Sequence, residues 1–101
     1  MKVIVLNCGS SSIKYQLFDL PSREVLAKGL VDKIGLKGSL IKHSRNDGVE
    51  VKLEGEILDH QLGIEYLLGV LISEKYGSIK SLDEIQAVGH RVVHAGEKFN
   101  G

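Results

Sequence analysis

Disulfide bonds cannot stabilise this chain, because its 101 residues contain a single cysteine, Cys8. A protein without disulfides is typical of a reducing compartment, so we expect a cytoplasmic protein. A long apolar run is also missing: the run at residues 3–6 is too short for the core of a signal peptide or for a membrane span. We therefore expect no membrane partner.

Neither sign of charge is in excess, since 13 lysines and arginines balance 13 aspartates and glutamates. This balance gives no reason to expect a nucleic acid as partner, and any anion site has to be local, built from a few side chains and backbone N–H groups. Apolar residues make up 43% and charged residues 26%, which is typical of a globular protein, and the length suits one domain or a part of one.

The pattern of apolar residues predicts a run of strands, then one helix, then a last strand. Residues 2–8 are apolar on both alternating faces, which favours a strand inside a sheet. Asp47 and Gly48, between two extended runs, indicate a hairpin turn. The expected strands are residues 2–8, 13–20, 24–34, 39–45, 49–54 and 86–94, with a bulge expected at Gly29.

Residues 60–76 are expected to form the helix. Four apolar residues recur on one face with helical spacing: Ile64, Leu67, Leu68 and Leu71. Asp59 suits the position that caps the start of a helix, and Gly77 suits the position after its last turn. A short helical turn is expected near residues 82–85.

The turn after the first expected strand carries hydroxyls, a glycine and a cation, since residues 7–14 read NCGSSSIK. Gly9 lets the backbone approach a ligand closely, and the serine hydroxyls and N–H groups can donate to phosphate oxygens. Ser12 and Lys14 share one face of the second strand, so Lys14 places a cation beside the turn. Asn7 offers an uncharged oxygen that suits Mg²⁺ or its waters.

This turn is not a P-loop, in which a glycine precedes the lysine, a serine or threonine follows it, and a helix begins. Here Ile13 precedes Lys14 and Tyr15 follows it. A plain serine-rich hairpin turn is the alternative, since serine and glycine dominate turns in general. Cys8 has no activating base near it in the sequence, so it is expected to be a small buried side chain rather than a nucleophile.

A second motif, VGHRVVHAG at residues 88–96, lies in the last expected strand. Arg91 and Val93 share one face, about 7 Å apart, so a guanidinium could bind the oxygens of a short carboxylate while the valine contacts its carbon tail. An ordinary ion pair between Arg91 and a surface carboxylate is the alternative. His90 and His94 lie about 13 Å apart on a strand, too far to share a zinc ion, and are expected to be structural.

Together the two motifs resemble the signatures of the acetate kinase family. VLNCGSSSIK at residues 5–14 is similar to the first signature, and VGHRVVHAG is similar to the second. The resemblance implies an α/β fold of the actin and sugar-kinase superfamily, in which two similar domains enclose a nucleotide. Here the elements run in α+β order, and residues 1–101 would form part of the first actin-like, ribonuclease H-like domain.

The resemblance also implies an activity: reversible, Mg²⁺-dependent transfer of a phosphoryl group from ATP to acetate, giving acetyl phosphate and ADP. Asn7 would help to bind Mg²⁺ and the transferred group, and Lys14 would lie at the ATP phosphates. Ser10 and Ser12 would belong to the phosphate loop. The implied partners are ATP or ADP, a short-chain carboxylate and, for the full-length protein, a second copy in a homodimer.

On the side of the acid, the resemblance implies that Arg91 binds the carboxylate and stabilises the transition state, while Val93 lines the pocket for the acetate methyl group. The family has two glycines after the second histidine, whereas the first is Ala95 here, which puts the shape of this loop in question. Further catalytic groups of the family lie beyond residue 101, so we expect the chain alone to be inactive.

Three other hypotheses stay open. The chain could belong to a propionate kinase, to a non-catalytic actin-like module that binds nucleotide, or to an unrelated small α+β domain whose hairpin binds nothing. A second arginine and a histidine downstream would favour a kinase over the binding module. Phosphate binding at residues 9–14 would exclude the third hypothesis.

Overall fold

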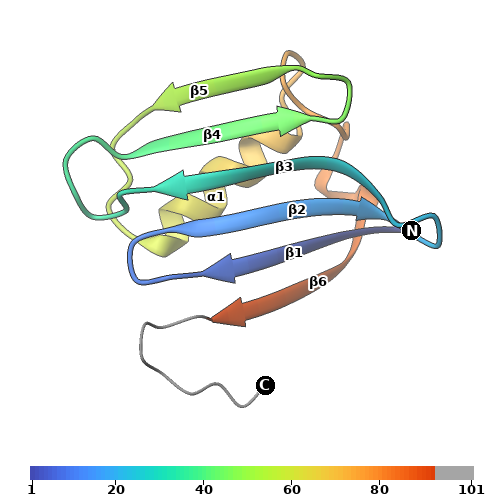
Figure 1. Ribbon diagram of the computed structural model, residues 1–101, viewed down its shortest axis with the longest axis horizontal. Coiled ribbons are helices and arrows are strands. Elements are labelled where there is room, and N and C mark those ends of the chain that lie inside the picture. The colour runs from blue at the N-terminus through green and yellow to red at the C-terminus, as the bar shows by residue number, and fades with distance from the viewer. Residues whose placement is uncertain (93–101) are drawn as a thin grey trace.

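The computed structural model describes residues 1–92 and shows one twisted sheet with a single α-helix across one face (Figure 1). The elements, in chain order, are β1 (Lys2–Cys8), β2 (Ile13–Asp19), β3 (Glu24–Asp32), β4 (Leu40–Arg45), β5 (Glu50–Glu54), α1 (His60–Leu71), the 3₁₀ helix η1 (Leu82–Glu84) and β6 (Ile85–Val92). The expected α/β class and the order of strands, helix and strand are confirmed. The predicted strand bounds are correct to within two residues wherever they fall in the described part.

The strands lie in the order β5-β4-β3-β2-β1-β6. Neighbours pair antiparallel, except that β6 runs parallel to β1. β1 is therefore an interior strand, as its two apolar faces predict. Because β1 and β6 point the same way, their carboxyl ends reach the same edge of the sheet, where the turn from β1 to β2 also lies (Figure 1).

The core lies between the sheet and α1. Alternate residues of β1 and β2 face the helix and are almost fully buried, among them Ile4, Ile13 and Leu17. Leu67 and Leu71 of the expected helical stripe are fully buried as well. Burying a side chain of this size stabilises the fold by about 1.5–3 kcal/mol. These contacts fix α1 on one face, and no helix of residues 1–92 covers the other face of the sheet.

The start of α1 agrees with the sequence. The carboxylate of Asp59 caps the helix by accepting a hydrogen bond from the N–H of Leu62 at 2.9 Å. This contact satisfies one of the backbone donors that a helix leaves free at its first turn. Neither α1 nor any other helix in residues 1–92 is long and apolar enough to cross a lipid bilayer.

The end of α1 differs from the prediction, because the helix stops at Leu71 instead of continuing to residue 76. The hydroxyl of Ser73 accepts the N–H of Tyr76 at 2.9 Å, and such a local bond competes with the helical pattern. The chain then turns back, and the N–H of Ile79 donates to the carbonyl of Leu71. Gly77 does not follow the last helical turn as predicted; it lets the backbone pass that carbonyl, which a Cβ atom would strike.

The glycine of β3 also has a different role from the predicted one. The irregularity between β2 and β3 lies at Leu26, which has no partner in β2, whereas Gly29 pairs regularly with Tyr15 and with His43. The rings of Tyr15 and His43 stack across it, with centroids 5.8 Å apart. A Cβ atom on Gly29 would collide with the Tyr15 ring and lie 2.5 Å from the carbonyl oxygen of Lys42. Gly29 is therefore required by close packing.

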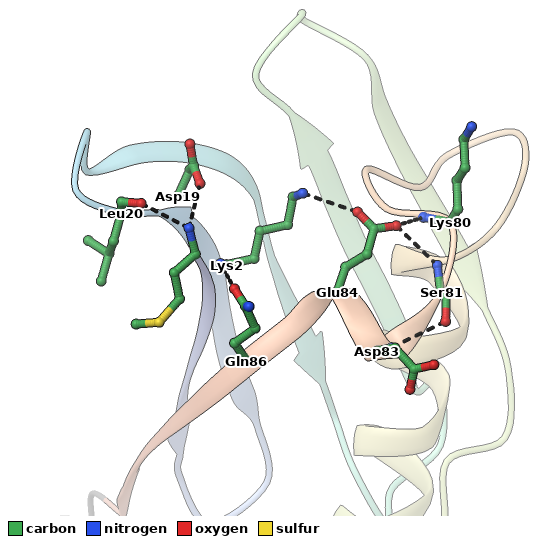
Figure 2. A network of polar contacts seen from close by, with 9 residues as sticks. Lys2, Asp19, Leu20, Lys80, Ser81, Asp83, Glu84 and Gln86 are labelled. Carbon is green, nitrogen blue, oxygen red and sulfur yellow. Dashed lines mark hydrogen bonds and ion pairs between the residues drawn. The ribbon is translucent and has the colours of Figure 1, made fainter.

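A polar network holds the start of β6 beside the start of β1 (Figure 2). The carboxylate of Glu84 accepts the backbone N–H groups of Lys80 and Ser81 at 2.7 and 3.3 Å, and its other oxygen contacts Nζ of Lys2 at 3.1 Å. Both charged side chains are partly exposed and screened by solvent, so the ion pair itself contributes little to stability. Its effect is mainly to align the two strands.

One residue of β6 is skipped in this alignment. The register shifts by one residue between Lys2 and Val3, and Gln86 is the residue without a partner in β1. The side-chain oxygen of Gln86 accepts the backbone N–H of Lys2 at 3.2 Å (Figure 2). Because of this shift, Asn7 lies opposite Arg91 and not opposite the residue before it.

Replacing Gly29 by alanine is expected to lower the free energy of unfolding by about 1–3 kcal/mol or more, because the added methyl group overpacks the contact with Tyr15. Urea denaturation measures this change. Gly69→Ala is the matched control: a Cβ atom at this exposed helical position meets nothing within 4 Å, so alanine should stabilise by about 0.5–1 kcal/mol. Equal stabilities of the two variants would contradict the packing role of Gly29.

Candidate functional site

Asn7, at the end of β1, lies at the centre of the candidate site. It pairs with Lys14 of β2 on one side and with Arg91 of β6 on the other. Neighbouring strands are about 4.8 Å apart, so the backbones of Lys14 and Arg91 lie about 10 Å apart across Asn7. The sheet thereby brings the two sequence motifs together in one row of cross-strand pairs.

An open hollow of about 710 Å³ begins at Asn7 and Lys14 and extends over the uncovered face of the sheet. The charged residues of its lining are Lys14, Lys28, Lys42, Lys52 and Glu50. Within residues 1–92, none of these four lysines forms an ion pair. The chain is neutral in total, yet the lining of this hollow is positive, and such a hollow attracts anionic ligands.

The turn between β1 and β2 is held by hydrogen bonds to its carbonyl groups. The N–H of Gly9 donates to the carbonyl of Ser12 at 2.8 Å, and the N–H of Ile34 donates to the carbonyl of Ser11 at 2.9 Å. A Cβ atom at residue 9 would lie 3.0 Å from the Ser12 hydroxyl oxygen, so glycine keeps the turn tight. Within the described residues, the N–H groups and hydroxyls of Ser10, Ser11 and Ser12 donate no hydrogen bond.

Cys8 is buried, as predicted. The sequence shows no base near Cys8, but the fold brings one close: Sγ of Cys8 lies 3.2 Å from Nε2 of His90. Burial raises the pKa of the Cys8 thiol, which keeps it protonated at neutral pH. The buried Cys8 and the exposed His90 therefore form a polar contact that joins β1 to β6 beside the site.

Tyr15 and His43 form a buried polar pair beneath the hollow. Nε2 of His43 lies 3.1 Å from the carbonyl oxygen of Tyr76 and must donate to it, which leaves Nδ1 to accept the Tyr15 hydroxyl at 2.6 Å. Burial lowers the pKa of His43 and the nearby charge of Arg45 lowers it further, while the bond to the Tyr76 carbonyl acts in the opposite direction. The neutral imidazole is the form that fits this position.

Three residues for which the sequence predicts a role lie outside the described residues: Val93, His94 and Ala95. Arg91 is placed by its backbone pairing. In residues 1–92, no three histidine, cysteine, aspartate or glutamate side chains converge on a point that could hold a metal ion. The atoms near the turn that could bind a metal ion are neutral oxygens, of Asn7 and of the serines.

Sequence reasoning missed two residues that shape the site. His60, the first residue of α1, reaches the turn, where its Nε2 lies 2.7 Å from the carbonyl oxygen of Gly9. Gln86 is the skipped residue that sets the register of β6. Neither could be found from local patterns, since both partners lie more than fifty positions away in the sequence.

Comparison with known proteins settles the family. The model of the acetokinase family matches residues 2–101. The chain belongs to this family. It is 65% identical over 100 residues to an acetate kinase of Azobacteroides pseudotrichonymphae and 58% identical to one of Bacteroides thetaiotaomicron, in each case covering 99% of this chain and 25% of the relative.

Two crystal structures show the same fold. An acetate kinase of Porphyromonas gingivalis superposes with a TM-score of 0.88 at 54% identity, covering 97% of this chain and 25% of that one. A propionate kinase of Francisella tularensis superposes with a TM-score of 0.75 at 32% identity, covering 94% and 23%. The chain thus spans about a quarter of the length of the family members that it matches.

The lowered pKa of His43 predicts a loss of stability in mild acid. Above the unfolded pKa of 6.5 the residue is neutral in both states; below it, only the unfolded chain takes up the proton readily. The free energy of unfolding should therefore fall as the pH drops below 6.5, by at most about 1.4 kcal/mol per pH unit from this residue. Urea denaturation between pH 7.5 and 5.5 measures the slope.

The matched variant is His43→Gln, whose amide can keep both hydrogen bonds but cannot titrate. Its stability should change less over the same interval. An identical slope in both proteins would assign the pH dependence to other groups.

Proposed function

We propose that this chain is the first part of a kinase that transfers a phosphoryl group between ATP and a short-chain carboxylate, with acetate as the preferred acid. Residues 1–101 would then be part of the first of its two actin-like domains. The observation that carries the proposal is the row of Lys14, Asn7 and Arg91 at one edge of the sheet, next to a turn whose serine N–H groups donate no hydrogen bond within residues 1–92. Membership of the acetokinase family supports the same reaction.

On the nucleotide side, this chain supplies donors and a positive charge. The N–H groups and hydroxyls of Ser10 and Ser12 donate to phosphate oxygens, as backbone nests do in other anion sites. Lys14 neutralises part of the phosphate charge and is exposed on the hollow beside them. Such groups act mainly by positioning, because phosphoryl transfer needs alignment and charge neutralisation rather than covalent help from the protein.

The Mg²⁺ implied by the resemblance to this family would take only one of its oxygen ligands from this chain and the rest from the nucleotide and water. Mg²⁺ prefers oxygen ligands and keeps several waters, and nucleotide phosphates supply most of the rest. Asn7 offers a half-buried amide oxygen at the end of β1, which suits Mg²⁺ or one of its waters. When bound, the ion would neutralise charge on the phosphates and orient them. The amide oxygen of Asn7 would hold the ion, directly or through one of its waters.

On the acid side, Arg91 binds the carboxylate and the equatorial oxygens of the transferred group. One carboxylate oxygen bonds to the γ-phosphorus while the bond from that phosphorus to the bridging oxygen breaks, giving acyl phosphate and ADP. No general base is required, because the carboxylate is already ionised at neutral pH. Negative charge collects between the two substrates, where a planar guanidinium can contact both. Val93 would contact the carbon tail and so limit the length of the acid.

A propionate kinase is the second candidate, favoured by the structural similarity to such an enzyme at 32% identity. The two candidates share every role described above and differ only in the room beside Val93. The decisive comparison is the ratio of kcat/KM for acetate and propionate in the full-length protein, which also serves as the reference for the variants below.

Arg91→Lys in the full-length protein is expected to lower kcat by about 10²–10³-fold, equivalent to about 3–4 kcal/mol. Lysine keeps the charge but loses the planar fork that holds two oxygens. The KM for acetate should rise, while the KM for ATP should change little. Hydroxamate formation from acetate and ATP measures all three constants.

Arg23→Lys is the control for this experiment, since Arg23 lies exposed in the turn between β2 and β3, at the other end of the sheet. Its kinetic constants should match those of the unaltered protein. If Arg91→Lys also retains full kcat, Arg91 is a structural residue and the proposed acid site is wrong.

Asn7→Ala in the full-length protein is expected to raise the Mg²⁺ concentration that gives half-maximal rate, by about 10–100-fold, because an oxygen ligand or a partner of a bound water is lost. Mg²⁺ titrations at saturating ATP measure this shift. Asn46→Ala, in the exposed turn between β4 and β5, is the control and should leave the titration unchanged. An unshifted curve for Asn7→Ala would mean that Asn7 only shapes the turn.

A further inference from the structure

His60 joins the start of α1 to the turn between β1 and β2. Its ring is half-buried, and Nε2 lies 2.7 Å from the carbonyl oxygen of Gly9. A carbonyl oxygen can only accept a hydrogen bond, so Nε2 must carry the proton and donate. Figure 1 shows that α1 begins at the same end of the sheet as this turn. The cap at Asp59 fixes the first helical turn and hence the position from which His60 reaches out.

This hydrogen bond fixes the direction of one peptide group in the turn. In a trans peptide, the carbonyl of one residue and the N–H of the next point in opposite directions. The carbonyl of Gly9 points to His60, so the N–H of Ser10, in the same peptide unit, points away from it. The carbonyl of Ser11 accepts the N–H of Ile34 in the same manner, so the N–H of Ser12 points away from Ile34.

We propose that His60 is a positioning residue, which holds the Ser10 N–H in the direction of a bound phosphate oxygen. The inference rests on the proposed function for its kinetic consequence. The bond to Gly9, and a Ser10 N–H group that donates to no acceptor in residues 1–92, are features of the fold itself. His60 does not touch the nucleotide in this scheme; it acts through the Gly9 peptide. Without it, that peptide can rotate, and the donor is no longer aligned in advance of binding.

Three variants of the full-length protein test this role. His60→Leu removes the donor and keeps an apolar side chain at the helix start. His60→Gln restores a donor at the end of the side chain. Gln61→Leu, at the exposed next position of α1, makes the same polar-to-apolar change without contact to the turn.

His60→Leu should lower kcat/KM for ATP by roughly 10–100-fold, the loss typical of a misplaced group near a reacting centre. His60→Gln should stay within about threefold of the unaltered protein, since a single hydrogen bond is restored. Gln61→Leu should be unchanged. Thermal unfolding of all three, followed in parallel, separates a loss of alignment from a loss of fold.

Two kinetic results would overturn the inference. If His60→Leu behaves like Gln61→Leu, the bond to Gly9 has no effect on the nucleotide. If His60→Gln loses as much as His60→Leu, the ring packs the helix on the sheet and its N–H is not the active feature.

A binding measurement separates this inference from the proposed function. The amide resonance of Ser10 in ¹⁵N-labelled full-length protein is followed during titration with inorganic pyrophosphate. A shift in the unaltered protein that is much weaker in His60→Leu supports the role of His60 even if no acid is phosphorylated. No response of Ser10 in the unaltered protein, or an equal response in both, overturns it.

Discussion

The hydrogen-bonded register of β1 between β2 and β6 is the constraint on which the candidate site depends. Side chains alternate between the faces of a strand, so a slip by one residue would move a whole row to the other face. With the observed register, Asn7 lies between Lys14 and Arg91. The one-residue shift at Gln86 is part of that register, because it decides which residue of β6 stands beside Asn7.

Two faces with opposite character follow from the same alternation. One face of the sheet packs on α1 and supplies the core, whereas the other carries lysines around an open hollow. A neutral chain can thus present a positive surface, because the sheet sorts its charges by position and not by number. The positive field spreads over the same row that contains Asn7, which favours an anion at that edge.

Local patterns predicted the elements well but not their ends or contacts. Alternation and the helical stripe located α1 and the strands of the described residues, since these periods are properties of the chain itself. The end of α1 was predicted too late, because Ser73 and the burial of Ile79 turn the chain away. The role of Gly29 was also wrong, since it depends on the ring of Tyr15 from another strand. Each error involves a contact that periodicity does not reveal: a side-chain hydrogen bond at the end of α1, and the packing of Gly29 against a ring that is distant in the sequence but close in space.

By itself, the sequence determined the family, the kinds of element and the two motifs, because these are written in short runs of neighbouring residues. Only the tertiary structure decided that Asn7 stands between Lys14 and Arg91, and that the imidazole of His60 reaches the carbonyl of Gly9. These contacts arise from strand register and helix docking. Both are set by the burial of the whole core, which no local stretch of sequence contains.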